Sequence, residues 1–185
     1  MSAPTIRAPG TEVAIEMERR SLDALASSLE QAGVRYLIAG GLAVIAHGYL
    51  RFTSDLDLIL EPEPAALRRA IPVFIALGYA PRVPVKFEDF ADPEKRASWA
   101  REKGMLVFSL VSPQHDKTSV DLFLECPFDF DDAYSRALRD KTESGVELTF
   151  VPLTELLEMK RRAGRRNDLD DIEKLEAIRN EENPS

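Results

Sequence analysis

The chain has 185 residues, of which 44% are hydrophobic and 30% are charged, and its formal net charge is −8. A chain of this length and composition can bury a core of its own, so the sequence predicts a folded protein and excludes intrinsic disorder. The acidic balance disfavours a protein that coats nucleic acid, because phosphate backbones are bound through basic surfaces.

The sequence also indicates a compartment. It contains no apolar run near 20 residues, so we expect no transmembrane helix and no membrane partner, and the first ten residues lack the apolar core of a signal peptide. Cys126 is the single cysteine, which permits no internal disulfide and fits a reducing environment. We therefore expect a cytoplasmic protein.

Hydrophobic periodicity and the positions of glycine and proline divide the chain into helices and strands. Helices are predicted over 13–31, 42–47, 62–77, part of 89–103, 131–138, 154–163 and from 167 or 168 onward. Strands are predicted over 34–38, 54–60, 105–111, 118–125 and 146–151. The turn-rich segment 112–117 makes a hairpin of the third and fourth strands. This order predicts an α+β fold.

Two details of the last helices are also predicted. Thr154 is the expected N-cap of the helix that ends before Gly164. In the final helix, four residues at helical spacing are expected to form one apolar stripe: Leu169, Ile172, Leu175 and Ile178.

Asp55 and Asp57 lie on the strand predicted over 54–60, shortly after the glycine pair Gly40 and Gly41. Side chains at i and i+2 of a strand share a face, so both carboxylates can converge on one or two divalent cations. The glycine pair suits a tight turn that opens a helix. The plain alternative is an acidic strand face and an ordinary turn. The apolar neighbours of the acids disfavour it, because unpaired carboxylates beside a core repel each other and are costly to desolvate. The stretch predicts a metal and nucleotide site.

A third acid, Asp121, lies inside an apolar run on the strand predicted over 118–125. If that strand pairs beside 54–60, Asp121 faces the same side as Asp55 and Asp57. Three acids would then complete a two-metal site, in which the third binds one ion and helps to deprotonate an attacking hydroxyl. Two alternatives stay open, because alternation alone does not fix the register: Asp121 pairs with Lys117 or an arginine, or Glu125 takes its place.

The segment 160–166 carries five cations in seven residues. Its ordinary interpretation is a solvated helix end that complements the helix dipole. Lys160, however, lies one turn from Leu156 and Leu157, so it can point toward the body of the protein and reach a triphosphate. Arg51, just before the strand of the two aspartates, is a second candidate for phosphate binding.

Taken together, these motifs resemble the DNA polymerase β-type nucleotidyltransferase superfamily. The spacing from Gly40-Gly41 through thirteen residues to Asp55-Leu56-Asp57, and later Asp121, carries the resemblance. The sequence of 39–57 is closer still to that of the small bacterial AbiEii/MenT-like branch of toxin–antitoxin nucleotidyltransferases. The segment 160–172 also resembles the C-terminal element of this branch. Asn167 departs from this branch, in which a lysine before the acid is common.

The resemblance implies a mixed, mostly antiparallel sheet flanked by helices, with a short C-terminal helical extension. It implies a core over 1–151 and an extension over 152–185, which together can form one compact domain. It also implies transfer of a nucleoside monophosphate from a bound NTP such as ATP to an acceptor hydroxyl, with release of pyrophosphate and with two Mg²⁺ ions, or Mn²⁺ in their place.

By position, each candidate residue receives a role from the resemblance. The expected metal ligands and catalytic acids are Asp55, Asp57 and Asp121, and the expected nucleotide-binding residues are Gly40, Gly41, Arg51, Ser54 and Lys160. The acceptor is open between RNA, protein and a small molecule. A toxin acting on RNA or protein, with an antitoxin protein as partner, is the first interpretation. An aminoglycoside-like small-molecule transferase is the nearest alternative, and a catalytically silent module that binds nucleotide or a partner protein is the third.

Overall fold

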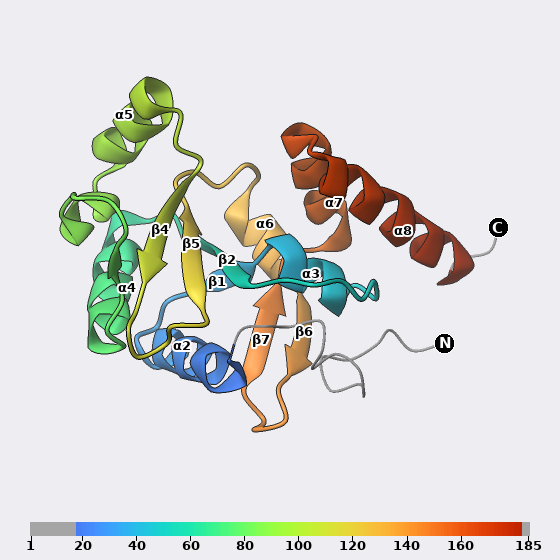
Figure 1. Ribbon diagram of the computed structural model, residues 1–185, viewed down its shortest axis with the longest axis horizontal. Coiled ribbons are helices and arrows are strands. Elements are labelled where there is room, and N and C mark those ends of the chain that lie inside the picture. The colour runs from blue at the N-terminus through green and yellow to red at the C-terminus, as the bar shows by residue number, and fades with distance from the viewer. Residues whose placement is uncertain (1–17, 183–185) are drawn as a thin grey trace.

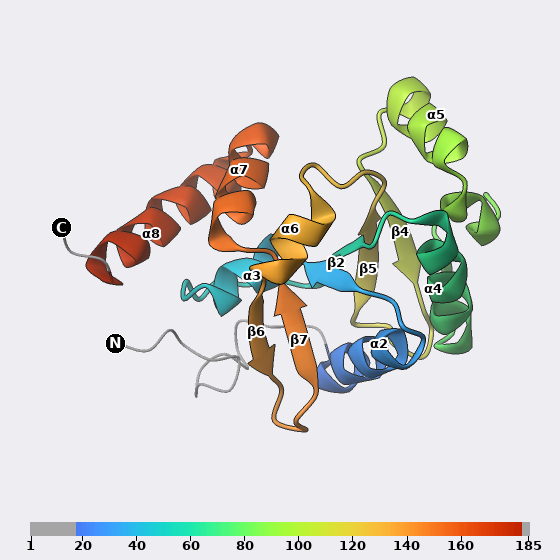
Figure 2. The same cartoon turned by 180° about the vertical axis from the view of Figure 1, so that it is seen from behind.

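The computed structural model describes residues 18–182, and these form helices packed around a single sheet (Figures 1 and 2). The helices are α2 (Arg19–Gln31), α3 (Gly40–Ala46), α4 (Pro64–Ala76), α5 (Pro93–Lys103), α6 (Phe130–Ser135), α7 (Leu153–Ala163) and α8 (Arg166–Glu182), with a 3₁₀ turn η1 (Phe87–Ala91). The strands are β1 (Tyr36–Ile38), β2 (Asp55–Leu60), β3 (Ala80–Pro81), β4 (Val107–Val111), β5 (Ser119–Phe123), β6 (Leu138–Lys141) and β7 (Glu147–Phe150). The fold is α+β, as the sequence predicts.

The strands form one mixed sheet in the order β3-β4-β5-β2-β1-β7-β6. Among the described residues, β1 pairs parallel with β7 and β2 pairs parallel with β5. The other four pairings are antiparallel, and one of them is the predicted hairpin of β4 and β5. The sheet is therefore mixed and mostly antiparallel, and β2 and β5 are neighbours at its centre.

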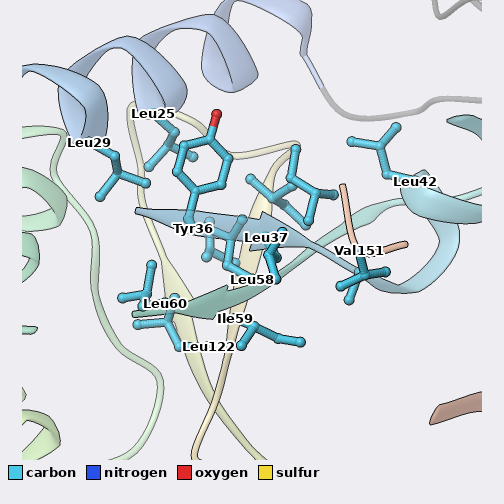
Figure 3. Packing of buried hydrophobic residues seen from close by; sticks show 14 of the residues in the cluster. Leu25, Leu29, Tyr36, Leu37, Leu42, Leu58, Ile59, Leu60, Leu122 and Val151 are labelled. Atoms are coloured by element: carbon cyan, nitrogen blue, oxygen red, sulfur yellow. The ribbon is translucent and has the colours of Figure 1, made fainter. Parts of the chain in front are cut away.

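Alternating side chains of the central strands make the core. Leu56, Leu58, Val120 and Leu122 are at most 1% exposed, because they share the sheet face that the helices cover. Figure 3 shows Leu25 and Leu29 of α2 beside Tyr36 of β1, above the leucines of β2. Each fully buried leucine contributes about 1.5–3 kcal/mol to folding, so this alternation fixes the register of β2 and β5.

The C-terminal helices α7 and α8 lie side by side next to α3, on the side of the molecule away from α4 and α5, as Figures 1 and 2 both show. Gly164, with a φ of 61°, ends α7 in the left-handed conformation and lets the chain turn into α8. Leu156, Leu157 and Leu175 belong to the same cluster of buried hydrophobic residues as the sheet. No helix in the described range 18–182 is long and apolar enough to span a bilayer.

The structure corrects several local expectations. The helix predicted over 131–138 ends at Ser135, and Leu138 begins β6, an edge strand that the sequence analysis missed together with β3. Thr154 lies inside α7 and does not cap it, because the helix begins at Leu153 after Pro152. Leu169 is 59% exposed, so the apolar stripe of the last helix does not begin there. Residues 13–17 of the first predicted helix lie outside the described range.

Candidate active site

The three predicted aspartates lie on one face of two paired strands. In the parallel pairing of β2 and β5, Asp57 stands directly opposite Asp121, and Asp55 stands opposite Ser119. Because paired residues project to the same side of a sheet, Asp55, Asp57 and Asp121 face one space. The condition that the sequence left open, that β5 lies beside β2, is met. Glu125, the competing candidate, follows the end of β5 and is exposed.

These carboxylates are not neutralised within the described chain. None of the three forms an ion pair with a lysine or arginine between residues 18 and 182, so the alternative of an Asp121–Lys117 pair is not observed. The Ser119 hydroxyl donates to Asp55 Oδ1 at 2.5 Å. Burial, then the negative charges of Asp121 and Asp55, raise the pKa of Asp57 to about 7, against a smaller opposite effect of Lys160 and Arg165. A bound cation would stabilise the charged form of Asp57 and so offset both its burial and its repulsion by Asp121.

Gly40 and Gly41 bring the backbone of α3 against the strand of the acids. Gly40 has a φ of +62°, and a Cβ atom there would lie 1.8 Å from Asp57 Oδ2. A Cβ atom at Gly41 would lie 2.5 Å from Thr53 Oγ1. Ordinary side chains are therefore excluded at both positions, and Ala39 N–H donates to the Asp57 carbonyl at 2.9 Å and fixes the approach. A backbone surface without side chains lies beside the carboxylates.

Lys160 points into the protein, as its distance of one turn from Leu156 predicts. It is 6% exposed, and its Nζ atom lies 3.1 Å from Asp168 and 2.7 Å from Asp171 of α8. Asp171 also receives a 2.5 Å hydrogen bond from Arg51, the other predicted phosphate-binding cation. Both cations thus belong to one network, buried at Lys160 and half-buried at Arg51, that joins the segment before β2 to the C-terminal helices. This network lies close enough to Asp57 for Lys160 to lower its pKa.

The donor set fits a magnesium–nucleotide complex. Magnesium binds proteins through one or two carboxylates and keeps several water or phosphate ligands, and Asp55, Asp57 and Asp121 supply hard oxygen donors on one face. Between residues 18 and 182, no three His, Cys, Asp or Glu side chains are close enough to form a metal cage by themselves. Ser54, the remaining predicted nucleotide contact, is half-buried directly before Asp55 and lines a pocket with it.

Several residues of this region were not predicted from the sequence. Ser119 precedes Asp121 by two positions, so the alternation that selected Asp121 could also have selected Ser119. Thr53 contacts Gly41 only through the fold, and no local signal marks it. The partnership of Asp168 and Asp171 with Lys160 depends on how α7 packs against α8, which helical spacing alone does not give.

The basic run is largely paired within the C-terminal helices. Arg161 contacts Glu176, Arg162 contacts Glu158, and Arg165 lies 3.8 Å from Asp168. Four of the five cations in 160–166 are therefore held in intramolecular ion pairs, so the segment is less basic as a surface than its composition indicates.

Comparison with known proteins identifies the architecture. The sequence matches no protein-family model, and no curated protein matches it significantly. The lincosamide antibiotic adenylyltransferase LnuA, in its lincomycin-bound crystal structure, superposes over 88% of this chain and 99% of its own, with a TM-score of 0.58 and 14% identity. This chain has the nucleotidyltransferase fold.

Two further structures agree. A Thermotoga maritima protein provisionally assigned as a nucleotidyltransferase matches over 90% of this chain and 92% of its own, with a TM-score of 0.53 and 14% identity. The structure of ANT(2″)-Ia with adenylyl-2″-tobramycin matches over 86% of this chain and 93% of its own, with a TM-score of 0.52 and 11% identity. At such identities the likeness concerns the fold, while activity is argued from the site.

Proposed function

We propose that the protein is a metal-dependent nucleotidyltransferase that moves a nucleoside monophosphate from an NTP to an acceptor hydroxyl. The observation that carries the proposal is the register of β2 and β5, which sets Asp57 opposite Asp121 and beside the glycine backbone of α3. A catalytically silent nucleotide binder has no need for an acceptor-side acid, which makes Asp121 the residue that favours an enzyme.

The chemistry is a displacement at the α-phosphorus. The acceptor oxygen forms a bond to the α-phosphorus, the bond from that phosphorus to the oxygen that bridges to the β-phosphate breaks, and pyrophosphate leaves. Asp55 and Asp57 would hold Mg²⁺ or Mn²⁺, which offsets the charge of the triphosphate and of the leaving pyrophosphate. Asp121 accepts the proton of the attacking hydroxyl, and Gly40 and Gly41 admit the triphosphate to backbone groups.

Lys160 and Arg51 are the proposed phosphate-binding cations. In the described structure they share Asp171, so an incoming triphosphate would compete for cations that are already oriented. The orientation of both cations is therefore set before the anion binds, which lowers the entropic cost of ordering them, while their ion pairs with Asp171 oppose binding.

The acceptor has two candidates. An RNA- or protein-directed toxin with an antitoxin partner follows from the resemblance of the sequence, but the pairing of Arg161, Arg162 and Arg165 within the C-terminal helices removes much of the basic surface that RNA would require. A small-molecule acceptor agrees with that pairing. One structural neighbour, LnuA, is named as an antibiotic adenylyltransferase, and another, ANT(2″)-Ia, is in complex with adenylyl-2″-tobramycin. We therefore place a small-molecule acceptor first.

The test is transfer of label from each α-labelled NTP, with magnesium, to a mixed pool of cellular small molecules and, separately, to total RNA and protein. The wild-type protein should transfer label only with metal, while Asp55→Ala and Asp57→Ala should reduce transfer by far more than tenfold. Residual activity within tenfold of wild type, about 1.4 kcal/mol of barrier, would show that these acids do not hold an essential metal. Label found on RNA rather than on small molecules would reverse the order of the two acceptors.

A further inference from the structure

A pocket of about 330 Å³ lies where β2 and β5 begin, and Asp55 is the one of the three aspartates that lines it. Ser119 of β5 and Val111 of β4 line it from the sheet. Across the same face, Asp121 stands opposite Ser109 of β4. The backbone of Arg82, just past β3, donates to the carbonyl of Ser109 at 2.9 Å, which continues this row by one more strand. The pocket therefore extends from the acids toward the β3 edge of the sheet.

The outer wall of the pocket is fixed by contacts that need no ligand. It is the turn 112–118 between β4 and β5, where the Tyr79 hydroxyl donates to the Thr118 carbonyl at 3.0 Å and the Ser112 hydroxyl donates to the Leu77 carbonyl at 3.0 Å. The His115 ring stacks on Tyr79 with centroids 5.5 Å apart. The wall is thus preorganised, as expected of a binding pocket and not of a loose surface turn.

Two cations, Arg82 and Lys117, line this outer end. Both are exposed, and neither lies within ion-pair distance of an acid anywhere in the described range 18–182. Asp116 lines the same end and offsets one of them, while Asp55 lies at the inner edge and already accepts from Ser119. Arg82 and Lys117 against Asp116 therefore give the end of the pocket away from Asp55 one net positive charge, which Asp55 balances over the pocket as a whole, although the whole protein carries −8. Local charge, and not the overall balance, decides which group binds there.

We propose that this pocket is the acceptor subsite, and that Arg82 and Lys117 select an acceptor bearing an anionic group, a phosphate or a carboxylate. The inference rests on the proposed nucleotidyl transfer and names the substrate class of that site. Two strand spacings separate Asp121 from Arg82, about 10 Å along the sheet. The acceptor is accordingly a small hydroxyl compound, with its reactive hydroxyl at the aspartates and its anionic group at the end of the pocket that Arg82 and Lys117 line. Its size is that of a sugar phosphate or a sugar acid, since ligand pockets begin near 300 Å³.

The experiment compares four sugars of one scaffold that differ in charge: neutral glucose, glucose 6-phosphate and glucuronate with an anionic group at C6, and glucosamine with a cationic amine at C2. Binding to the full-length protein is measured by calorimetry without NTP or metal, and NMP transfer is measured separately with magnesium and each NTP. We expect one of the two anionic sugars to bind at least tenfold more tightly than glucose or glucosamine. The comparison of phosphate with carboxylate identifies the group that fits.

The variants Arg82→Gln and Lys117→Gln should each reduce this preference about tenfold, and in transfer the loss should appear in KM while kcat is kept. Arg68→Gln and Lys103→Gln are the matched controls, because these exposed cations lie outside the pocket and should change nothing. Preference for glucose or glucosamine, or an anion preference that both pocket variants retain, would overturn the subsite.

The two proposals fail separately. Arg82-dependent binding of an anionic sugar without any NMP transfer would support the subsite and contradict the proposed reaction. Transfer to other acceptors by a protein that binds none of the anionic sugars would contradict the subsite and leave the reaction standing.

Discussion

The substitution Asp121→Asn should stabilise the metal-free protein at alkaline pH. Asp57 has a pKa of about 7 against an ordinary value of 3.8, a difference that corresponds to about 4 kcal/mol. Burial is the largest cause and the charge of Asp121 is the next, so we assign about 1–2 kcal/mol to the repulsion between these two acids. For a protein of this size that energy corresponds to an increase in Tm of about 3–6 °C.

The effect should depend on pH in a defined direction. Between pH 3.8 and about 7 the folded state keeps the proton of Asp57 while the unfolded state has lost it, so stability falls as pH rises through this window. At pH 8.5 Asp57 is charged, and the variant should melt above wild type. At pH 5 Asp57 carries its proton, the repulsion is absent, and the two melting temperatures should agree.

The assay is thermal unfolding in EDTA at both pH values, with Asp116→Asn as the control, because this exposed acid lies on the turn before β5 and is not a neighbour of Asp57 in the sheet. Magnesium with NTP at about 100 times its dissociation constant should then add about 2.7 kcal/mol to wild type and a similar amount to the variant, because we expect the variant to keep its affinity for NTP. An Asp121→Asn protein that melts below wild type at pH 8.5 would refute the reasoning and make Asp121 a structural residue.

Three further predictions follow from single contacts. Gly40→Ala should abolish transfer, because its Cβ atom would overlap the carboxylate of Asp57. The control Gly33→Ala has a similar φ of +64° but open space around its Cβ atom, so it should cost about 1 kcal/mol of stability and retain activity. Label transfer and melting of both variants test this. Lys160→Met should destabilise the protein by about 3–5 kcal/mol in urea unfolding, because it leaves two buried aspartates without their shared lysine, and a loss no larger than the few tenths expected for Arg161→Met would contradict the buried network. In nucleotide titrations Lys160→Met should weaken NTP binding, whereas Asp121→Asn should bind NTP normally and fail in turnover; the opposite pattern would exchange their roles.

The sequence predicts most of the central sheet and both aspartates of β2, because buried leucines alternate with polar residues there. It does not decide whether Asp121 joins them, since its position depends on the pairing of β5 with β2, in which the paired residues are 64 positions apart in the chain. The edge strands β3 and β6 were missed because they are short and largely exposed, so their sequences lack an alternating pattern. The predicted cation Lys160 faces inward as expected, but its two acidic partners come from a different helix, which no local pattern indicates.

The parallel register of β2 and β5 has an evolutionary consequence. Val120 and Leu122 are buried on one face while Asp121 lies between them on the other, so a slip by one residue would expose two apolar side chains and bury the acid. Burial of the apolar side chains in the core therefore fixes the position of the acids. The turn 112–118 precedes β5 and takes no part in that register, so mutation can lengthen or recharge it while the acids keep their places. Under the proposed function, acceptor preference can therefore change through this turn and Arg82 while the positions of the three acids are conserved.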